Sequence, residues 1–368
     1  MKIPYTKLGK ETLPNLESFI HDIPNFLASG QFILGETVTT FEKSFAIHQG
    51  TKHAVSVNSG FDALFLTLLA CGVGPGDEVI TAPNSFIATA AAIVHTGAKP
   101  VFVDVCDDRN INPKEIERWI THRTKAIIPI HLAGRPARMG EISDFAARIG
   151  VTIIEDCAQA VGSLIHGQPV GSIGRAGCFS FHPLKNLAAL GDGGCIVTND
   201  DELADSLRLL RNHGLLDRNT TSCWGFNSRL DSLQALWLLQ KLVGLEGILT
   251  KRKDNARRYL KELADIPGLV LPKLTSDLVH TWHAFVIEVD QRKELQAHLA
   301  NKGIEALIHY PVPIHLQPAA LQLGYGPGSF PVCEQQASRI LSLPIRDSLE
   351  RDEISQVVTQ IRIFFQNS

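Results

Sequence analysis

The chain has 368 residues, of which 44% are hydrophobic and 20% are charged, a composition typical of a globular protein with a substantial core. This composition excludes a disordered or coiled-coil protein. The formal net charge of -3 provides neither a basic field for nucleic acid nor a polybasic segment for a membrane surface. We therefore expect no nucleic-acid partner and no membrane partner.

Two further features concern location and metal binding. The first 15 residues lack the apolar core of a signal peptide, and the longest largely apolar run, 86–94, is far shorter than the roughly 20 residues that a membrane-spanning helix needs. The seven cysteines are scattered, and no two of them are two or three positions apart, so the spacing predicts neither a disulfide framework nor a zinc site. We expect a cytoplasmic protein without a metal.

The length favours a large domain followed by a smaller one. Two helices, at 16–27 and from residue 37 onward, are predicted to form an N-terminal cap. From residue 53 strands alternate with helices, which is typical of a mainly parallel sheet covered by helices on both faces. The predicted strands are 54–57, 78–81, 99–105, 125–130 and 151–155, and the predicted helices are 61–69, 85–95, 113–121 and 139–149.

The pattern changes after residue 162. Strand-like segments follow one another up to residue 198, so we expect the sheet to be completed there, and one of these strands can be antiparallel. A helix at 201–210 and a long helix at 232–263, broken or bent near Gly244 and Gly247, lead away from the sheet. The remainder predicts a smaller α+β domain with strands 284–289 and 305–309 and helices 294–301, 333–340 and 351–365. We place the boundary between a large α/β domain, 1–240, and a small C-terminal α+β domain, 241–368.

Lys185 is the first candidate for chemistry. It lies between two strand-like runs, 178–181 and 195–198, and most of its neighbours are apolar. An amine in such surroundings loses hydration, which lowers its pKa and makes it reactive toward carbonyl groups. The alternative interpretation is an ordinary solvated lysine on a loop.

A phosphate site is predicted next to one of the strand ends, where open parallel sheets bind ligands. Ser59 and Gly60 follow the strand 54–57 and begin a helix, and the N–H groups of such a turn attract anions. Ser180, five residues before Lys185, could add a hydroxyl to the same phosphate.

Two more strand ends carry groups suited to a planar, positively charged ring. Asp156 ends a buried strand, with Gln159 three residues later, and is either a helix N-cap or the partner of a positive group on a ligand. Phe86 begins another helix, where its ring lies on a planar ligand or packs in the core.

Together, an amine for a Schiff base, a carboxylate for a pyridinium nitrogen, an aromatic ring and a helix N-terminus are what pyridoxal 5'-phosphate requires. Motifs of competing sites are absent from the sequence, which has no G-x-x-x-x-G-K-[ST], no G-x-G-x-x-G after a strand, no G-x-S-x-G and no H-E-x-x-H. The residues therefore favour a pyridoxal-phosphate enzyme.

Seven motifs extend this interpretation over nearly the whole chain. They are NSGFDAL at 58–64, GVGPGDEVI at 72–80, IIEDCAQAVG at 153–162, SFHPLKNLAALGDGG at 180–194, RNHG at 211–214, GFNSRLDSLQA at 225–235 and HYPVPIHLQPA at 309–319. In this order the motifs resemble the DegT-type nucleotide-sugar aminotransferases. The resemblance implies a fold type I pyridoxal-phosphate enzyme that binds its cofactor in the large domain and works as a homodimer, with each site built at the subunit interface.

The resemblance also implies a role for each matching residue. Lys185 would hold the cofactor as a Schiff base, and Asp156 would keep the pyridine nitrogen protonated. Gln159 would contact the ring and Phe86 would stack on it. The residues that match the phosphate cradle are Ser59, Gly60, Phe61 and Ser180, together with Asn227 of the neighbouring subunit.

On the substrate side, Arg229 matches a contact to a carboxylate or to the substrate. The other residues that match substrate positions are His182, His309, Tyr310 and His315. Some positions depart from the family pattern: Phe61 replaces a threonine or serine, and Leu184 replaces a small or hydroxylated residue. His182 is typical of members that aminate C4 of the sugar, whereas the Gly-Asp-Gly-Gly run at 191–194 is typical of those that aminate C3, so both ring positions stay open.

The implied reaction transfers an amino group from an amino acid, glutamate in the resembled family, to the ketone of a nucleotide-linked keto sugar, with pyridoxamine 5'-phosphate formed on the way. Lys185 would move the proton during this transfer. One alternative is a sugar dehydratase or an aminoshikimate-type synthase of the same fold; the dehydratases lack the lysine. Another alternative is a regulatory protein that retains the fold without turnover. The sugar, the nucleotide and the pathway stay open at this point.

Overall fold

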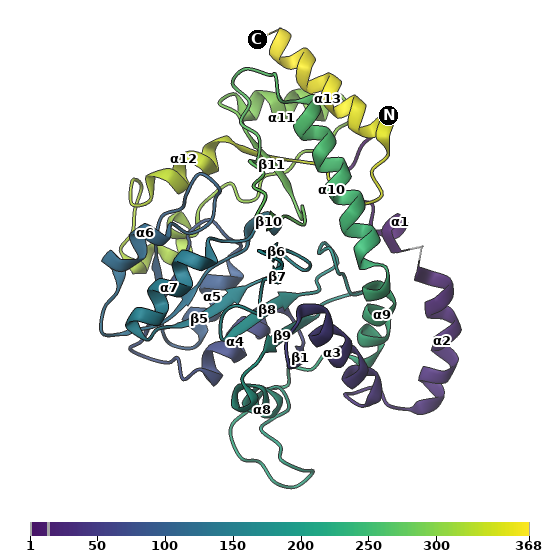
Figure 1. Cartoon of the computed structure of the whole chain (residues 1–368), viewed down its shortest axis with the longest axis vertical. Coiled ribbons are helices and arrows are strands. Elements are labelled where there is room, and N and C mark those ends of the chain that lie inside the picture. The colour runs from purple at the N-terminus through teal and green to yellow at the C-terminus, as the bar shows by residue number, and fades with distance from the viewer. Residues whose placement is uncertain (1, 13–14, 368) are drawn as a thin grey trace.

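The computed structural model describes residues 2–12 and 15–367. Its largest part is built on a seven-stranded sheet with the strand order β1-β9-β8-β5-β4-β2-β3 (Figure 1). Only β9 runs antiparallel to its neighbours in this sheet, as the sequence allowed. The strands are β1 (His53–Val57), β2 (Glu78–Thr81), β3 (Lys99–Phe102), β4 (Thr124–Ile128), β5 (Thr152–Asp156), β8 (Ala176–Ser180) and β9 (Gly194–Thr198).

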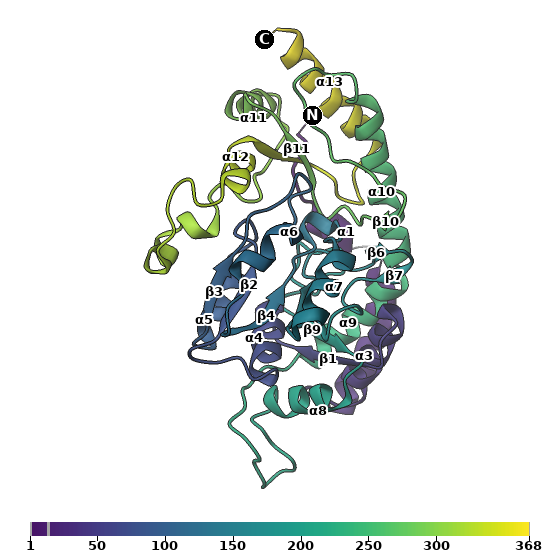
Figure 2. The same cartoon turned by 60° about the vertical axis from the view of Figure 1, so that its left-hand side comes forward.

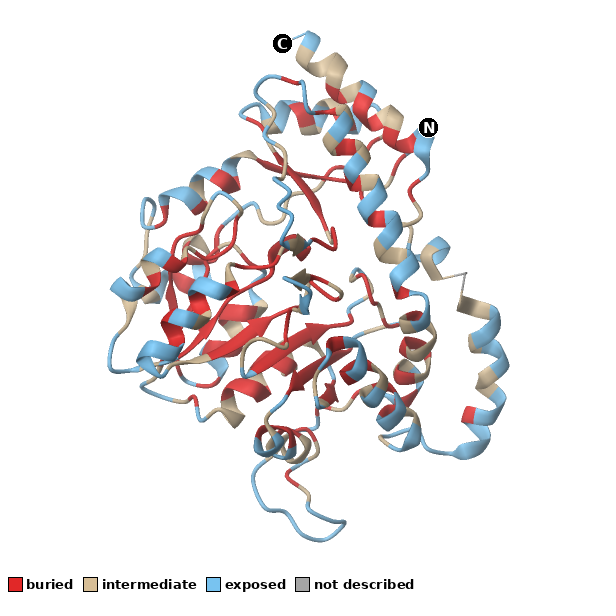
Figure 3. Cartoon of the chain, viewed as in Figure 1, coloured by how far each residue is buried: buried red, intermediate tan, exposed pale blue. Residues whose placement is uncertain are grey.

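Helices cover both faces of this sheet, which is why its strands are buried almost throughout (Figure 3). Alternate residues of a strand point to opposite faces: Ala126 and Ile128 pack with helices α4 and α5, and Ile127 packs with α7. The helices over the first face are α4 (Gly60–Ala70), α5 (Ala88–His95) and α8 (Asp201–Leu210), and those over the second are α3 (Glu36–Gln49), α7 (Met139–Ile149) and α9 (Ser232–Val243). The predicted class, α/β with a mainly parallel sheet between helices, is confirmed.

Several helices differ from the predicted ranges. The helix predicted at 85–95 begins only at Ala88, and the one predicted at 113–121 is a short α6 (Pro113–Ile116) followed by a 3-10 turn, Glu117–Trp119. The long helix predicted at 232–263 is interrupted at Gly244, as expected, into α9 and α10 (Leu245–Glu262). At the N-terminus, α2 (Leu16–Ser29) precedes α3, in which Val38, Phe41 and Phe45 are buried as predicted.

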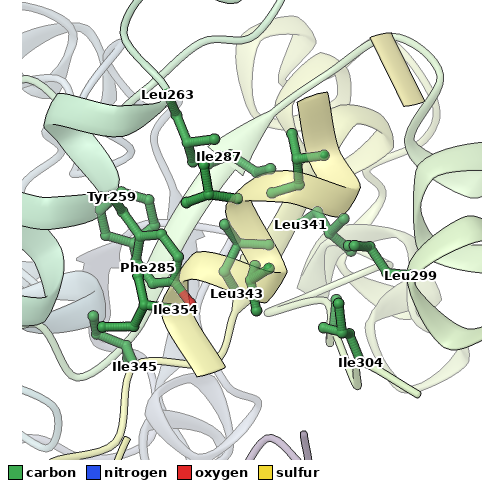
Figure 4. Close-up of a cluster of buried hydrophobic side chains, with 14 of the residues drawn as sticks. Tyr259, Leu263, Phe285, Ile287, Leu299, Ile304, Leu341, Leu343, Ile345 and Ile354 are labelled. Atoms are coloured by element: carbon green, nitrogen blue, oxygen red, sulfur yellow. The ribbon is translucent and has the colours of Figure 1, made fainter. Parts of the chain in front are cut away.

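The C-terminal part has its own core, shown in Figure 4, around Tyr259, Phe285 and Leu341. The predicted strand 305–309 is wrong, because only Leu307 pairs there, with Ser342. A strand at 340–343 takes its place beside β11. The elements are β11 (Phe285–Glu288), α11 (Arg292–Asn301), α12 (Pro331–Arg339), β12 (Ile340–Leu343) and α13 (Arg351–Gln366), with 3-10 turns at Ile314–Leu316 and Pro318–Leu323. The domain boundary at 240/241 stays a prediction.

A small three-stranded sheet lies between the two parts, with the order β10-β6-β7: β6 (Leu164–Ile165), β7 (Gln168–Pro169) and β10 (Leu278–Val279). Within the described ranges, no helix is long and apolar enough to cross a membrane.

The N-terminal segment runs along the C-terminal part, beside α13 (Figure 2). Ile3 forms a parallel bridge with Ile304, the Tyr5 N–H donates to Glu305 Oε2 at 2.7 Å, and Lys7 pairs with Glu353 at 2.8 Å. The segment ends in α1 (Leu8–Thr12), a helix that the sequence did not predict. We call residues 2–12 the N-terminal strap.

Candidate active site

A cavity of about 510 Å³ opens where β1, β2, β4, β5 and β8 end, and we call it the main cavity. Parallel strands that end at one edge bring residues from distant parts of the chain together there. Most of the predicted site residues line it: Ser59, Gly60, Phe61, Phe86, Asp156, Gln159, Ser180, His182, Lys185, His309 and Tyr310.

One end of the main cavity is formed by the first turn of α4. Ser59 caps the helix, its Oγ accepting from the Asp62 N–H at 3.1 Å. Among the described residues, no group accepts a hydrogen bond from the N–H of Gly60 or of Phe61. A Cβ on Gly60 would lie 2.5 Å from the Ser180 Cβ, so only glycine lets this turn approach the end of β8. Two free N–H groups at a helix N-terminus form an anion site.

The ring of Phe61 is held by contacts with other rings. Its ring stacks on Phe65, with centroids 6.0 Å apart, and meets His95 edge-on at 5.5 Å. The aromatic contacts explain why a phenylalanine is accommodated at a position where the sequence comparison expects a hydroxyl. The phosphate end therefore has one hydroxyl fewer than the family pattern predicts.

Asp156 does not cap a helix, because residues 157–163 following β5 are turns. Its carboxylate is 5% exposed overall, accepting from Thr89 Oγ1 at 2.8 Å and from the Ala158 N–H at 3.1 Å. Sequence reasoning missed Thr89; a threonine inside the apolar run of α5 was the available signal. Ser85 Oγ in turn donates to Thr89 Oγ1 at 3.1 Å, so a short chain of hydroxyls fixes the carboxylate at the cavity wall.

Lys185 lies in a turn in which its N–H donates to the His182 carbonyl at 2.8 Å. Burial lowers the pKa of its amine from 10.5 to about 8, and the Asp156 carboxylate partly opposes this shift. The sequence predicted a lowered pKa from the apolar neighbours. The neutral fraction of the amine near physiological pH is therefore much larger than that of a solvated lysine.

The Phe86 ring is 56% exposed and faces Tyr310, with ring centroids 5.8 Å apart, so it is not a core residue. Gln159 links this side of the cavity to the sheet: its Oε1 accepts from the Ala133 N–H at 2.6 Å, and its Nε2 donates to the Tyr310 hydroxyl at 3.4 Å. Burial, helped by the Asp156 charge, raises the pKa of Tyr310 to about 12. Its phenol is therefore protonated throughout the physiological range.

Three histidines also line the cavity. His309 Nδ1 lies 2.9 Å from Ser342 Oγ, and burial, with a smaller effect of Lys185, lowers its pKa to about 4. His182 is exposed, and the Leu184 N–H lies 3.3 Å from its Nδ1. His283, which sequence reasoning missed, has a buried Nδ1 without a partner, and burial holds its pKa well below 6.5. At neutral pH His283 and His309 are therefore uncharged.

Three predicted site residues lie elsewhere. His315 is fully buried, with Nε2 3.0 Å from Glu334 Oε1 and Phe330 edge-on to its ring, so it does not line the main cavity, and its role as a substrate contact stays a prediction. Asn227 bridges to Asn212, and Arg229 donates to Asn212 Oδ1 at 3.0 Å, outside the cavity of their own chain. Their assignment to a neighbouring subunit stays a prediction.

Other residues reach the main cavity from parts of the chain without a motif. The N-terminal strap contributes Tyr5, Thr6, Leu8 and Glu11, and the C-terminal part contributes Arg252, Glu305, Leu307 and Arg346. No signal in the sequence singles them out, because the strap and residue 305 meet only in the folded chain.

A buried group of possible metal ligands, His131, Glu155 and Cys157, lies below the site. The Glu155 carboxylate accepts from the N–H groups of residues 171, 173 and 174 at 2.7 to 2.9 Å. His131 Nδ1 accepts from the Ala137 N–H at 2.9 Å, so its Nε2 carries the hydrogen that it donates to Glu155. Protein donors thus satisfy the carboxylate and the imidazole, and the group is explained as a structural network.

The groups around the main cavity fit pyridoxal phosphate. The free N–H pair of α4 and the adjoining Ser180 suit a phosphate, and the fixed carboxylate of Asp156 suits a protonated ring nitrogen. The exposed Phe86 ring suits a planar heterocycle, and the amine of Lys185 suits an aldehyde. This donor set does not fit a nucleotide held by a glycine-rich P-loop or a metal centre.

Comparison with known sequences agrees with this chemistry. A sequence model of the DegT/DnrJ/EryC1/StrS aminotransferase family matches residues 15–362. A dTDP-3-amino-3,4,6-trideoxy-α-D-glucose transaminase from Streptomyces venezuelae is 43% identical over 341 residues, covering 92% of this chain and 90% of that protein. A UDP-N-acetyl-3-dehydro-α-D-glucosamine 3-aminotransferase from Acidithiobacillus ferrooxidans is 42% identical over 362 residues, covering 98% and 97%. A protein called pleiotropic regulatory protein from Geobacillus stearothermophilus is 40% identical over 370 residues, covering 100% of each chain.

Among solved structures, S. venezuelae DesV in complex with a ketimine intermediate superposes with a TM-score of 0.97 at 41% identity, covering 99% of each chain. Both the fold expected from the motifs and the expected cofactor chemistry are therefore confirmed. The chain belongs to the DegT/DnrJ/EryC1/StrS family of pyridoxal-phosphate-dependent aminotransferases.

Proposed function

We propose that this aminotransferase moves the amino group of glutamate to the C3 ketone of a nucleotide-diphosphate sugar. The observation that carries the proposal is the main cavity, in which the amine of Lys185 and the carboxylate of Asp156 share a wall with the free N–H pair of α4. The transaminase from S. venezuelae is named for a 3-amino sugar, and the aminotransferase from A. ferrooxidans for a 3-dehydro sugar, which favours C3 over C4. The two names also favour dTDP or UDP as the nucleotide.

Pyridoxal phosphate, when bound, supplies the electron sink that makes the α-hydrogen of the donor acidic. Asp156 would accept a hydrogen bond from the protonated ring nitrogen, and Thr89 and the Ala158 N–H hold the carboxylate in place for it. The N–H groups of Gly60 and Phe61 bind the phosphate. These residues position the cofactor without themselves exchanging a proton.

Lys185 is the proton carrier in this proposal. With the cofactor bound, a neutral amine at Nζ would take the proton from the α-carbon of the donor and return it on the cofactor side, and it would serve in the reverse sense for the sugar ketone. The lowered pKa of Lys185, about 8, keeps part of the amine neutral at the pH of the reaction. Tyr310, still protonated, stays a hydrogen-bond donor beside the sugar.

We further propose a homodimer with shared sites, in which Asn227 binds the phosphate and Arg229 the substrate of the neighbouring subunit. Support comes from the loop after α8, which projects from the body of the protein (Figure 1). Its side chains include Trp224, 96% exposed, and Leu216, 62% exposed. Large apolar side chains exposed on a projecting loop are typical of an interaction surface.

The proposed compartment is the cytoplasm. All seven cysteines lie within the described ranges, and all are unpaired. Free thiols persist in reducing compartments, whereas secreted proteins tend to oxidise theirs to disulfides.

The test is a screen of dTDP- and UDP-linked 3-keto and 4-keto sugars with glutamate, with products identified by mass. We expect an amino sugar and 2-oxoglutarate in equal amounts from a 3-keto substrate. Amination of 4-keto sugars alone would overturn the choice of C3. A protein that binds pyridoxal phosphate and is not converted by glutamate would support the regulatory alternative, to which the name of the Geobacillus relative points.

A further inference from the structure

A second cavity of about 280 Å³ adjoins the main one behind Lys185, and we call it the rear cavity. Leu8, Glu11, Lys185 and Arg252 line both cavities, so they form the wall between them. The remaining polar residues of the rear cavity are Thr12, Asn186, Lys241 and Asp347. Of the cations in this wall, Lys185 already has a role in the proposed function and Arg252 has none.

Arg252 is a buried cation that no carboxylate of the described residues contacts. It lies on α10, is 7% exposed, and Nη1 donates to the Trp282 carbonyl at 3.1 Å. Its Nε is buried without a partner. Its Nη2 has no partner among the described residues either, yet it is not sealed from solvent. Burial lowers its pKa, and Asp347 and Glu11, which oppose this shift, lie beyond 4.0 Å.

The other buried arginines of the chain are all paired. Arg346 holds Glu353 with two hydrogen bonds of 2.7 and 2.8 Å, Arg211 forms an ion pair with Glu42, and Arg109 lies 3.9 Å from Glu288. Leaving a buried guanidinium without a carboxylate carries a large desolvation cost. Arg252 therefore differs from the buried arginines that serve the fold, and it differs at the wall of the active site.

We propose that Arg252 binds the carboxylate of the amino-acid donor, and of the 2-oxo acid formed from it, at the wall between the two cavities. The donor must place its amino group at the cofactor that Lys185 would hold, which brings its carboxylate close to that wall. The Nη2 of Arg252, which is not sealed from solvent and has no partner among the described residues, offers a charged donor that suits a carboxylate.

Lys241 adds a further cation to the rear cavity, whose lining also includes the carboxylates of Glu11 and Asp347. It is 6% exposed, and its Nζ donates to the Glu11 carbonyl at 3.1 Å with no carboxylate within 4.0 Å among the described residues. A second carboxylate on the donor would therefore find a cation without an ion pair behind Arg252, which favours a dicarboxylic amino acid over an uncharged one.

The inference rests on the proposed function, and the two half-reactions allow it to be tested separately. In Arg252→Met holoenzyme we expect the glutamate concentration for half-maximal bleaching of the cofactor band to rise about 10- to 100-fold, the range for loss of a charge-assisted pair. The KM for the keto sugar, measured on enzyme loaded with pyridoxamine phosphate, should change less than about twofold, since the sugar does not use Arg252.

Binding without turnover provides a second readout. Succinate should raise the Tm of the wild-type apoprotein and not that of Arg252→Met. Arg252→Lys keeps the charge but loses the planar guanidinium. The glutamate concentration for half-maximal bleaching in this variant should therefore lie between those of the wild type and of Arg252→Met. Arg109→Met is the matched control, because Arg109 also donates Nη1 to a backbone carbonyl, that of Val286 at 3.2 Å, yet it does not line either cavity.

The outcomes separate the two claims. If Arg252→Met needs no more glutamate than the wild type, or if Arg109→Met raises the requirement as much, the inference is overturned while the proposed function stands. If the wild type aminates no sugar, the proposed function fails, and the succinate experiment still decides whether Arg252 binds a carboxylate. Should Arg252→Met not fold, Arg252→Lys with an unchanged glutamate requirement overturns the inference.

Discussion

Replacing Lys185 by methionine should make the apoprotein more stable at neutral pH. The pKa of this amine is about 8 in the folded protein and 10.5 in the unfolded chain. The charged amine therefore destabilises the folded state relative to the unfolded one. A pKa lower by about 2.5 corresponds to about 3 kcal/mol, an upper limit because the side chain is only partly shielded from water. Methionine has a similar volume and no charge to bury.

The destabilisation by Lys185 depends on pH because the folded and unfolded states lose the proton of this amine at different pH values. Below pH 8 both states bind the proton and the full penalty of about 3 kcal/mol applies to the folded wild type. Between pH 8 and 10.5 the folded amine is neutral while the unfolded one is still charged, so the penalty shrinks as the pH rises and is about 1 kcal/mol at pH 9.5. Above pH 10.5 it disappears.

Urea unfolding of the two apoproteins at pH 7 and at pH 9.5 measures this difference. Subtracting wild type from variant at each pH removes the contributions of all other titrating groups. Lys253→Met, at an exposed position of α10, is the control and should show the same difference at both pH values. The argument is refuted if the Lys185→Met apoprotein is less stable than the wild type at pH 7. It is also refuted if the free energy of unfolding of the two proteins differs by the same amount at both pH values.

Three further predictions follow from the site. Asp156→Asn should lower turnover at least about 100-fold with little change in Tm, because an amide keeps the contacts but cannot keep the ring nitrogen protonated; a large drop in Tm with normal turnover would make the residue structural. Gly60→Ala should weaken cofactor binding, measured by titration, since the new Cβ would lie 2.5 Å from a side-chain carbon at the end of β8, whereas Gly74→Ala, with no atom within 4 Å, should not. Dimers refolded from an equal mixture of Lys185→Ala and Arg229→Ala should regain about a quarter of wild-type activity, because half the dimers are mixed and each has one intact site; no recovery in proven mixed dimers would place Arg229 in its own subunit's site.

The central sheet was predictable because its strands are apolar, separated by helices of ordinary length, and ended by turn residues. β12 was not, since it follows α12 at Ile340 without any intervening turn residue. The segment at 305–309 has strand composition, but only Leu307 finds a partner. Local composition gives the strand propensity of a segment. Whether the segment becomes a strand depends on pairing with residues far away in the chain.

Some residues of the site were likewise predictable from the sequence, and others were not. Lys185, Asp156 and Gly60 were found because each sits in a motif beside a strand end. Thr89 and Arg252 lie on helices of ordinary composition, and nothing local shows that Thr89 holds a carboxylate or that Arg252 lacks one. His315 lies in a motif yet points into the protein interior, because Glu334 and Phe330 enclose it. A motif thus locates a segment, and the packing around it decides which side chains reach the cavity.

The N-terminal strap has a consequence for synthesis. Tyr5 is bound to Glu305 across 300 positions, and Lys7 to Glu353 across 346. A ribosome adding about 5 to 20 residues per second needs roughly 15 to 60 seconds between making the two sides of the first contact. Throughout that interval the strap lacks Ile304, Glu305 and Glu353 to lie against, although strands β1 to β9 are complete once residue 198 has been made. The nascent enzyme should therefore be able to form the sheet and its phosphate site well before the wall made by Tyr5 and Glu11 exists, so cofactor can enter through an opening that the finished protein has covered.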